Sequence, residues 1–493
     1  MSLARSAPLA SSSSPAAPLA PAYILRAHAA PVSCLTFSQC GRFLYSGDTD
    51  GYVAVWHLRS FRPRYMWKAH EGGVLGLAEL EGGLLSQGRD NLIHLYRFPS
   101  SEHATTTAAV PAAATSVPSP SRPSPEFENG PAWSLDTNAM NFCRMSVLPL
   151  LKREQQEGKG KGRADPNEEE EDLPEQGGAL IAVPSLTKDE FVDIFHYPTR
   201  ARLHRSIGKD AFIGHKTGSV MAVQLWHLPS SEPASSRSDL TSAPTTTLHD
   251  DNPLASSSLE AEAKARADLH LLIGYESGHL ALFRFVPTSS SSFEVVRESG
   301  AAMYYRPREG KMVEENEGWE LVWVEKGHRD AVMSLAVDAK SRFAYTVAAD
   351  HFLCKYRISD LSAEEALLPR MHMEATPSPG KSGVAIREDG KLLATAGWDG
   401  ELRLYSAKTL APLAVLSLHR LSLQAIAFAP TTLTSSYALG GTLYDSSEEE
   451  EDSDKEAGNT AADSRKGGRL RMWLATGGQE SKISLWEPYP ARK

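Results

Sequence analysis

The sequence predicts an all-β protein built from seven copies of one β-hairpin, and two observations carry this prediction. The first is the stretch Ser46–Trp56, in which Asp48-Thr49-Asp50-Gly51 is typical of a tight turn and Tyr52–Trp56 alternates as a strand. Aspartate and glycine favour this turn because they tolerate positive φ values. The second is the recurrence of the pattern, which indicates a repeat architecture because each hairpin can bury its faces only against neighbouring copies.

The repeated pattern places a Ser or Thr first, an Asp four residues later and an aromatic residue six residues after the Asp. The fourth copy departs from it, since Ile273 and Ser277 stand in place of the hydroxyl residue and the Asp. The seven copies are Ser46-Asp50-Trp56, Ser86-Asp90-Tyr96, Ser185-Asp189-Phe195, Ile273-Ser277-Phe283, Thr346-Asp350-Tyr356, Thr395-Asp399-Tyr405 and Thr476-Glu480-Trp486.

These residues resemble those of the WD-repeat β-propeller family, in which each blade is a four-stranded antiparallel sheet. The resemblance implies a seven-bladed propeller, with Tyr23–Arg26 as the outer strand of the last blade, so that the chain ends pair and close the ring. It also implies that a His, a Ser or Thr, an Asp and a Trp form a buried hydrogen-bonded network in each blade. Such a network fits the chemistry, because a buried carboxylate needs donors and imidazole, hydroxyl and indole groups supply them.

The match to this network is complete in the first blade and partial in the others. The sixth blade lacks the His, and the seventh has Glu480 in place of the Asp. We expect Asp50→Ala to reduce stability and to affect no turnover. The residues assigned to structural networks are His28, Ser46, Asp50 and Trp56; His70, Ser86, Asp90 and Tyr96; His328, Thr346, Asp350 and Tyr356; Thr395, Asp399 and Tyr405; and His419, Thr476 and Trp486.

Three longer stretches are similar to the ASTRA-associated protein 1 family: HEGGVLGLAELEGGLLSQGRDNLIHLYRF, LLIGYESGHLALFRF and ATGGQESKISLWEPYP. This resemblance implies a non-enzymatic protein-interaction scaffold within an ASTRA-like complex, which serves chromatin remodelling and the maturation of phosphatidylinositol-3-kinase-related kinases. It further implies one copy of the chain in a hetero-complex, located in the nucleus and also in the cytoplasm. Two alternatives remain open: a substrate receptor of a ubiquitin ligase, and a signalling adaptor similar to a G-protein β-subunit.

The composition and charge of the chain argue against several classes of function. Much of the net charge of −10 lies in two acidic runs, Glu168–Asp172 and Glu448–Asp454, and no basic stripe offsets them, which argues against direct nucleic acid binding. The four cysteines form no C-x-x-C pair, so reduced thiols are expected. No apolar run is long enough to cross a bilayer, and no metal, cofactor or catalytic motif is recognised, so we expect a soluble protein without catalytic, cofactor or metal sites.

The expected propeller needs only about 300 residues at about 40–45 per blade, so much of the chain must lie outside it. We predict a disordered leader at 1–20 and a propeller at 21–490 that carries low-complexity insertions. Each insertion would follow a first or a third strand, and all would therefore emerge on one face. Either the opposite face, with short loops, binds partners, or the long loops do. The insertions predicted to be disordered are 100–131, 152–176, 229–267, 287–318 and 431–468.

Candidate interaction residues are few. Trp398 precedes Asp399 in a turn and is the favoured partner contact, because aromatic side chains dominate interface energetics. Trp67, Trp319 and Trp323 either contact partners or pack between blades. Acidic residues follow three serines, which are therefore candidate phosphorylation sites in a solvated loop: Ser446, Ser447 and Ser453.

Overall fold

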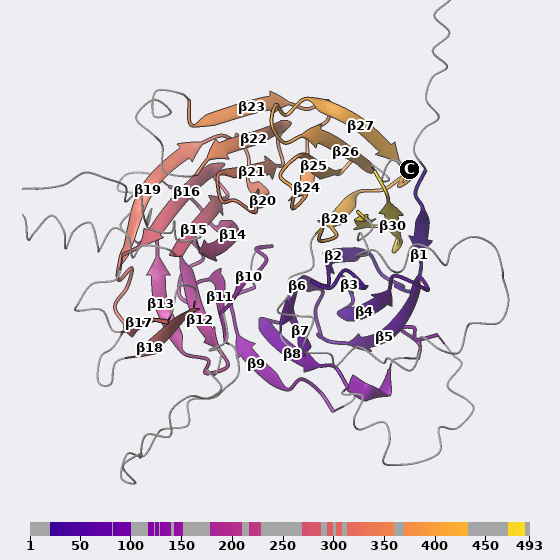
Figure 1. Cartoon of the computed structure of the whole chain (residues 1–493), viewed down its shortest axis with the longest axis horizontal. Coiled ribbons are helices and arrows are strands. Elements are labelled where there is room, and N and C mark those ends of the chain that lie inside the picture. Colours follow the sequence, from indigo (N-terminus) through magenta and orange to yellow (C-terminus); the bar gives the residue numbers. More distant parts are fainter. Residues whose placement is uncertain are drawn as a thin grey trace, which may run out of the picture.

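Seven four-stranded antiparallel sheets and one separate two-stranded hairpin make up the computed structural model of the chain. The sheets form the blades of a ring (Figure 1). The structure describes residues 20–80, 82–99, 117–122, 124–127, 129–139, 142–150, 178–209, 216–227, 269–286, 293–298, 302–307, 313–358, 369–431 and 472–488.

The blades follow one another along the chain, and their strands pair in sequence order. The strands of blades one to three are β2 (Val32–Phe37), β3 (Phe43–Asp48), β4 (Tyr52–His57) and β5 (Arg62–Lys68); β6 (Val74–Leu80), β7 (Gly83–Gly88), β8 (Leu92–Arg97) and β9 (Trp133–Asp136); and β10 (Ser146–Pro149), β11 (Ala179–Pro184), β12 (Val192–Tyr197) and β13 (Arg202–Ile207).

Blades four to seven continue this order, except that the last blade takes its outer strand from the start of the chain. Their strands are β14 (Val220–His227), β15 (Leu269–Tyr275), β16 (His279–Phe285) and β19 (Trp319–Lys326); β20 (Val332–Val337), β21 (Phe343–Ala348), β22 (Phe352–Arg357) and β23 (Met371–Ala375); β24 (Lys381–Ile386), β25 (Leu392–Gly397), β26 (Glu401–Ser406) and β27 (Pro412–Ser417); and β28 (Leu423–Phe428), β29 (Leu474–Gly478), β30 (Ile483–Trp486) and β1 (Tyr23–Leu25).

The first strand of each blade lies next to the central channel, and the fourth lies at the rim (Figure 1). Both faces of each sheet are buried between neighbouring blades. Successive residues of the middle strands are therefore apolar and point to opposite sides of the sheet. In β4, for example, Val53 and Val55 face blade two, whereas Ala54 and Trp56 face blade seven. Alternate residues of one strand therefore pack into two different cores, one on each side of the blade.

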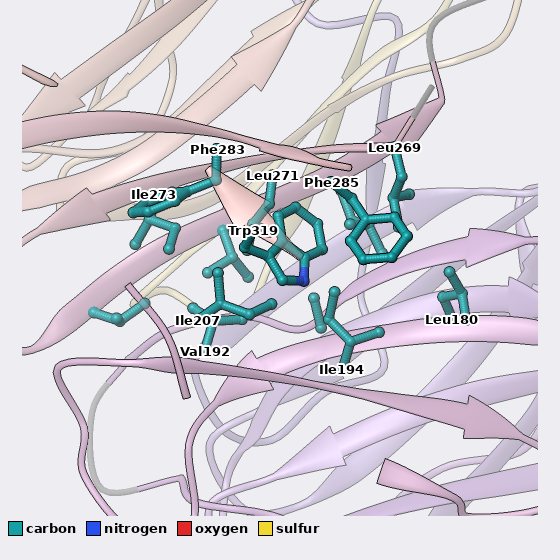
Figure 2. Packing of buried hydrophobic residues seen from close by; sticks show 14 of the residues in the cluster. Leu180, Val192, Ile194, Ile207, Leu269, Leu271, Ile273, Phe283, Phe285 and Trp319 are labelled. Atoms are coloured by element: carbon teal, nitrogen blue, oxygen red, sulfur yellow. The ribbon is translucent and has the colours of Figure 1, made fainter. Parts of the chain in front are cut away.

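Among the described residues, each of the seven interfaces between neighbouring blades contains one cluster of buried apolar side chains. Figure 2 shows the cluster between blades three and four, where Ile194 and Ile207 pack with Phe283, Phe285 and Trp319. Because blades seven and one share such a cluster as well, the ring is continuous.

The outer strand β1 pairs antiparallel with β30, so that Tyr23 lies opposite Leu485 and Leu25 lies opposite Ile483. The amide of Ala22 also donates a hydrogen bond to the carbonyl of Leu485, at 2.8 Å. Segments from near the two ends of the chain thus form one blade. The pairing satisfies the backbone groups at the edge of β30, which would otherwise be unpaired.

The connections differ between the two ends of the channel. Second-to-third and fourth-to-first connections lie on one face, named here the short-loop face. First-to-second and third-to-fourth connections lie on the opposite face, the long-loop face, where the described residues that flank the five insertions lie. Among the described residues, no helix is both long enough and apolar enough to span a bilayer.

Two insertions expected to be disordered contain described structure, which differs from the sequence prediction. In the range 287–318, β17 (Phe293–Glu298) pairs with β18 (Ala302–Pro307) as a hairpin. In the range 100–131, a 3₁₀ turn at Pro125–Phe127 (η2) inserts Phe127 into the core between blades one and two. Ordering entropy is offset there by burial of an aromatic ring, which composition alone did not indicate.

Candidate functional site

The network of blade one is built on Asp48, not on Asp50 as the sequence pattern predicted. His28 Nδ1 lies 2.7 Å from Asp48 Oδ2, and Asp48 is fully buried at the end of β3. Its other oxygen accepts the amides of Asp50 and Tyr52, at 3.0 and 2.9 Å. Asp50 itself is exposed in the turn. The turn contains two Asp residues. Asp48, at the end of the strand, is the buried one, and it is the one that contacts the imidazole of His28.

The rest of the blade-one network follows the sequence prediction. His28 Nε2 lies 2.6 Å from Ser46 Oγ, which also accepts the indole N–H of Trp56 at 2.8 Å. A neutral His28 that donates from Nδ1 to Asp48 would accept the Ser46 hydroxyl proton at Nε2, which uses every group in the chain of bonds.

Blades two and five contain the predicted His, hydroxyl and Asp contacts. His70 Nδ1 lies 3.0 Å from Asp90 and its Nε2 lies 2.9 Å from Ser86. In blade five the corresponding distances from His328 are 3.1 Å to Asp350 and 2.7 Å to Thr346.

The two tyrosines at the place of the indole donor make different contacts in these blades. Tyr96 donates its hydroxyl to the carbonyl of Ala69 at 2.9 Å, and Tyr356 stacks on Trp323 with ring centroids 6.0 Å apart. Tyr96 therefore bonds to the connection before blade two instead of to Ser86, and Tyr356 packs against blade four.

Arginine takes the place of histidine in blades three and six. In blade six, Arg403 donates to both oxygens of Asp399, at 3.0 and 2.6 Å, while Thr395 and Tyr405 are buried nearby. Burial alone would raise the pKa of Asp399, but its hydrogen bonds, above all those from Arg403, lower it to about 2. In blade three, Arg202 pairs with the buried Asp193 at 2.6 Å. The sequence pattern had aligned Asp189 there, which instead accepts the hydroxyl of Ser219.

Blade seven centres on Ser484, a residue that the sequence pattern missed. Its hydroxyl lies 3.0 Å from His419 Nε2 and 2.7 Å from Thr476 Oγ1, and it accepts the indole N–H of Trp486 at 2.9 Å. Glu480 lies 3.7 Å from His419 Nδ1. A signal was present, since a Ser in a strand buried on both faces needs partners.

These networks are unsuited to nucleophilic catalysis. Ser46 and Asp48 are fully buried, and the Ser46 oxygen already accepts an indole proton. A substrate could reach neither atom without unfolding the blade. The arrangement satisfies buried polar groups and fixes each hairpin on its neighbour.

One group of described residues, His70, Asp90 and His94, places possible metal ligands within 4.8 Å of one another. Protein partners already occupy most of these atoms, because His70 bonds to Asp90 and to Ser86, and His94 Nδ1 bonds to Ser134 at 2.8 Å. The two imidazoles stack at 4.9 Å, and burial lowers the pKa of both. We assign no metal to this group.

The mouth of the central channel on the short-loop face is hollowed. A cavity of about 600 Å³ opens there, lined by first-strand residues and by turn residues, including Trp398, Phe142, Arg89 and Arg144. Trp398 is 44% exposed, as the sequence indicated, and its ring rests on Gly380, where a Cβ would lie 2.1 Å from a ring atom.

The other sequence candidates fall elsewhere. Trp67, Trp319 and Trp323 are all buried between blades, so packing and not partner contact explains them. Ser446, Ser447 and Ser453 lie outside the described residues. Phe142 and Arg144 were not singled out from the sequence, because their meeting at the channel depends on the closed ring.

The fold and its networks define the class of the protein: a seven-bladed β-propeller with WD-type repeats. The family model for "WD domain, G-beta repeat" matches residues 19–57 and 377–406, which cover the networks' hairpins in blades one and six.

Relatives that align over nearly the whole chain carry the name ASTRA-associated protein 1. The protein of that name from Aspergillus niger is 28% identical over 499 residues, covering 96% of this chain and 98% of the relative. That from Penicillium rubens is 29% identical over 505 residues with the same coverage. The Schizosaccharomyces pombe protein is 27% identical over 432 residues, covering 83% and 93%. Among solved structures, the Myceliophteria thermophila Cps50 (Swd1) β-propeller domain aligns with a TM-score of 0.46 and 13% identity, over 96% of this chain and all of that chain.

Proposed function

We propose that this chain is a non-enzymatic scaffold that docks other protein subunits on the short-loop face of its propeller. The observation that carries the proposal is the exposure of large apolar side chains in the loops of that face. Four large apolar residues are exposed in its loops, namely Phe142 (56%), Leu186 (46%), Trp398 (44%) and Leu421 (50%).

Large apolar groups on loops cost free energy of hydration unless a partner covers them, and aromatic ones contribute strongly to binding. Most of the other exposed apolar residues of the described chain lie on the outermost strands β1, β19, β23 and β27. The short-loop face is therefore favoured over the long-loop face as the docking surface.

The name of the relatives supports a specific assembly. We propose that the chain is a subunit of an ASTRA-like complex and acts there in chromatin remodelling and in the maturation of phosphatidylinositol-3-kinase-related kinases. In this role a single copy of the chain acts within a hetero-complex, in the nucleus and also in the cytoplasm.

Affinity purification of the full chain followed by mass spectrometry tests this proposal. We expect kinase-maturation chaperones and helicase subunits to be recovered, and Trp398→Asp to deplete them. Leu413→Asp is a matched control, because Leu413 is 48% exposed but lies on the outer strand β27.

Three results would contradict the proposal. Recovery of the same partners by wild type and by Trp398→Asp would show that the partners do not dock on the short-loop face. Loss of partners on deletion of residues 432–468 alone would assign docking to the long loops. Recovery of cullin adaptors would indicate the ubiquitin-ligase alternative.

A further inference from the structure

The guanidinium of Arg144 reaches across the central channel. Arg144 lies two residues before β10 of blade three, yet its Nη2 donates to the carbonyl of Ser33 in blade one at 2.9 Å and to that of Gln424 in blade seven at 3.0 Å. These bonds hold Arg144 in the lining of the cavity at the channel mouth. Burial lowers the pKa of Arg144, but arginine remains charged at neutral pH.

Arg144 has spare hydrogen-bonding capacity. Within the part of the chain that the structure describes, its Nε and Nη1 form no hydrogen bond and it forms no ion pair. A buried or half-buried cation without an anion is costly, and both of its contacts are to neutral carbonyls. Among the described residues, this positive charge in the cavity has no counter-charge.

A second arginine reinforces this charge. Arg89, in the β7–β8 turn, also lines the cavity, with its guanidinium carbon 4.6 Å from the centre of the Phe142 ring. None of the described residues that line the cavity is Asp or Glu, although the chain carries a net charge of −10. The cavity is therefore a local basic site in an acidic protein.

The remaining walls match a peptide. The side-chain amides of Gln424 and Gln479 line the cavity and have no hydrogen-bond partner among the described residues, so they can pair with a peptide backbone. Trp398 and Phe142 offer exposed rings at the rim. A volume of about 600 Å³ is within the usual range for a small ligand or a short peptide segment.

We propose that the channel mouth binds a short acidic segment of a partner protein. A side-chain carboxylate of that segment accepts hydrogen bonds from Arg144 and pairs with Arg89, and an adjacent apolar side chain packs on Trp398 and Phe142. The occupant is inferred from charge complementarity, and the inference rests on the proposed docking function in that the segment belongs to a docked subunit. Nucleic acid fits less well, because two isolated arginines make no basic stripe along which a phosphate backbone could lie.

Selection from a display library of random dodecapeptides, with the full chain as bait, tests this directly. We expect the selected peptides to be enriched in Asp and Glu next to Phe, Leu or Trp. Their binding, measured by fluorescence anisotropy with the synthetic peptides, should weaken as ionic strength rises. Selected peptides that are neutral or basic would overturn the proposal.

Charge variants identify the site. Arg89→Glu changes an exposed turn residue and should raise the Kd about tenfold or more, because like charges now face the carboxylate. Arg144→Gln should do the same, and its folding is checked by its melting curve because the side chain also joins three blades. Arg59→Glu is the matched control: Arg59 is exposed in the β4–β5 turn on the long-loop face, and its Kd should not change.

Other results separate the alternatives. Unchanged affinity in Arg89→Glu and in a folded Arg144→Gln would overturn the proposal. Tighter binding when phosphoserine replaces the acidic residue would show that a phosphopeptide, and not a carboxylate, is the ligand, and displacement by a single-stranded oligonucleotide would show a nucleic acid. If partners are lost in Trp398→Asp but no acidic peptide binds, only this inference fails. If acidic peptides bind but Trp398→Asp recovers the same partners as the wild type, only the proposed docking function fails.

Discussion

At the scale of single residues, one position explains both the success and the error of the sequence prediction. The turn Asp48-Thr49-Asp50-Gly51 has two carboxylates, and the alignment of hairpins favoured the second. The structure uses the first, and His28 and Asp48 stand 20 residues apart, as do His70 and Asp90. The separation is 22 residues between His328 and Asp350, so the spacing from His to Asp alone does not choose between Asp48 and Asp50.

Asp48→Ala and Asp50→Ala should therefore differ in stability. Loss of Asp48 leaves a buried imidazole N–H and two backbone amides without their acceptor, which should cost about 2–4 kcal/mol. Loss of the exposed Asp50 side chain should change the free energy of unfolding by no more than about 0.5 kcal/mol. Urea denaturation of both variants measures the difference, and equal losses would contradict the assignment of Asp48.

His204 makes stability depend on pH. Burial lowers its pKa from 6.5 to about 3, and its Nδ1 accepts the indole N–H of Trp319 at 3.0 Å. The unfolded chain therefore binds a proton below pH 6.5 that the folded protein does not bind, so stability falls as the pH falls from 7 to 5. The slope from one such His is at most about 1.4 kcal/mol per pH unit.

His204→Asn should reduce this dependence, although it also lowers the melting temperature at pH 7. Part of the slope should remain, because burial also lowers the pKa of His70, His196 and His419. His372→Asn is the control, since that side chain is exposed, and its slope should match that of the wild type. The check is the melting temperature between pH 7 and pH 5. An unchanged slope in His204→Asn would contradict the role of this residue.

At the scale of elements, the hairpins were predictable and the segments that pack onto them from outside were not. Turn residues and alternating apolar residues are local signals, so all seven repeats could be located. The 3₁₀ turn at Pro125–Phe127 follows a long Ala, Thr and Ser-rich stretch and shows no such signal. Its place depends on a distant strand: Ser124 exchanges hydrogen bonds with the backbone of Met66, at 2.7 and 3.1 Å.

Phe127→Ala should test how much this element contributes. The ring stacks on Trp67 with centroids 4.1 Å apart and is buried between blades one and two. Its removal should cost about 3 kcal/mol, in the range for a buried aromatic residue. Phe142→Ala removes an exposed ring and should leave the melting temperature unchanged, so a similar drop in both variants would argue against the docking of this turn.

At the scale of the whole molecule, the sequence predicted the all-β class and the seven blades, because repetition of one unit implies neighbours for each unit. The channel mouth could not be predicted in the same way. Arg144, Ser33 and Gln424 come from three blades, and only closure of the ring brings them together. The sequence before β10 offered no period or motif to mark Arg144.

Removal of β1 tests the closed ring. Deletion of residues 1–20 should leave the melting temperature unchanged, because β1 is retained. Deletion through Ala27 removes the partner of β30 and the buried Leu25, and should lower the melting temperature by several degrees or more. Equal melting curves for the two truncated chains would show that the pairing of β1 with β30 contributes little.

The pairing of β1 with β30 also constrains how the protein is made. Tyr23–Leu25 is synthesised well before its partner strand Ile483–Trp486. Until the last blade has been synthesised, blade one therefore exposes the side of its sheet that carries Leu35 and Trp56. A nascent chain in this state is prone to aggregate or to bind a chaperone until the last blade forms.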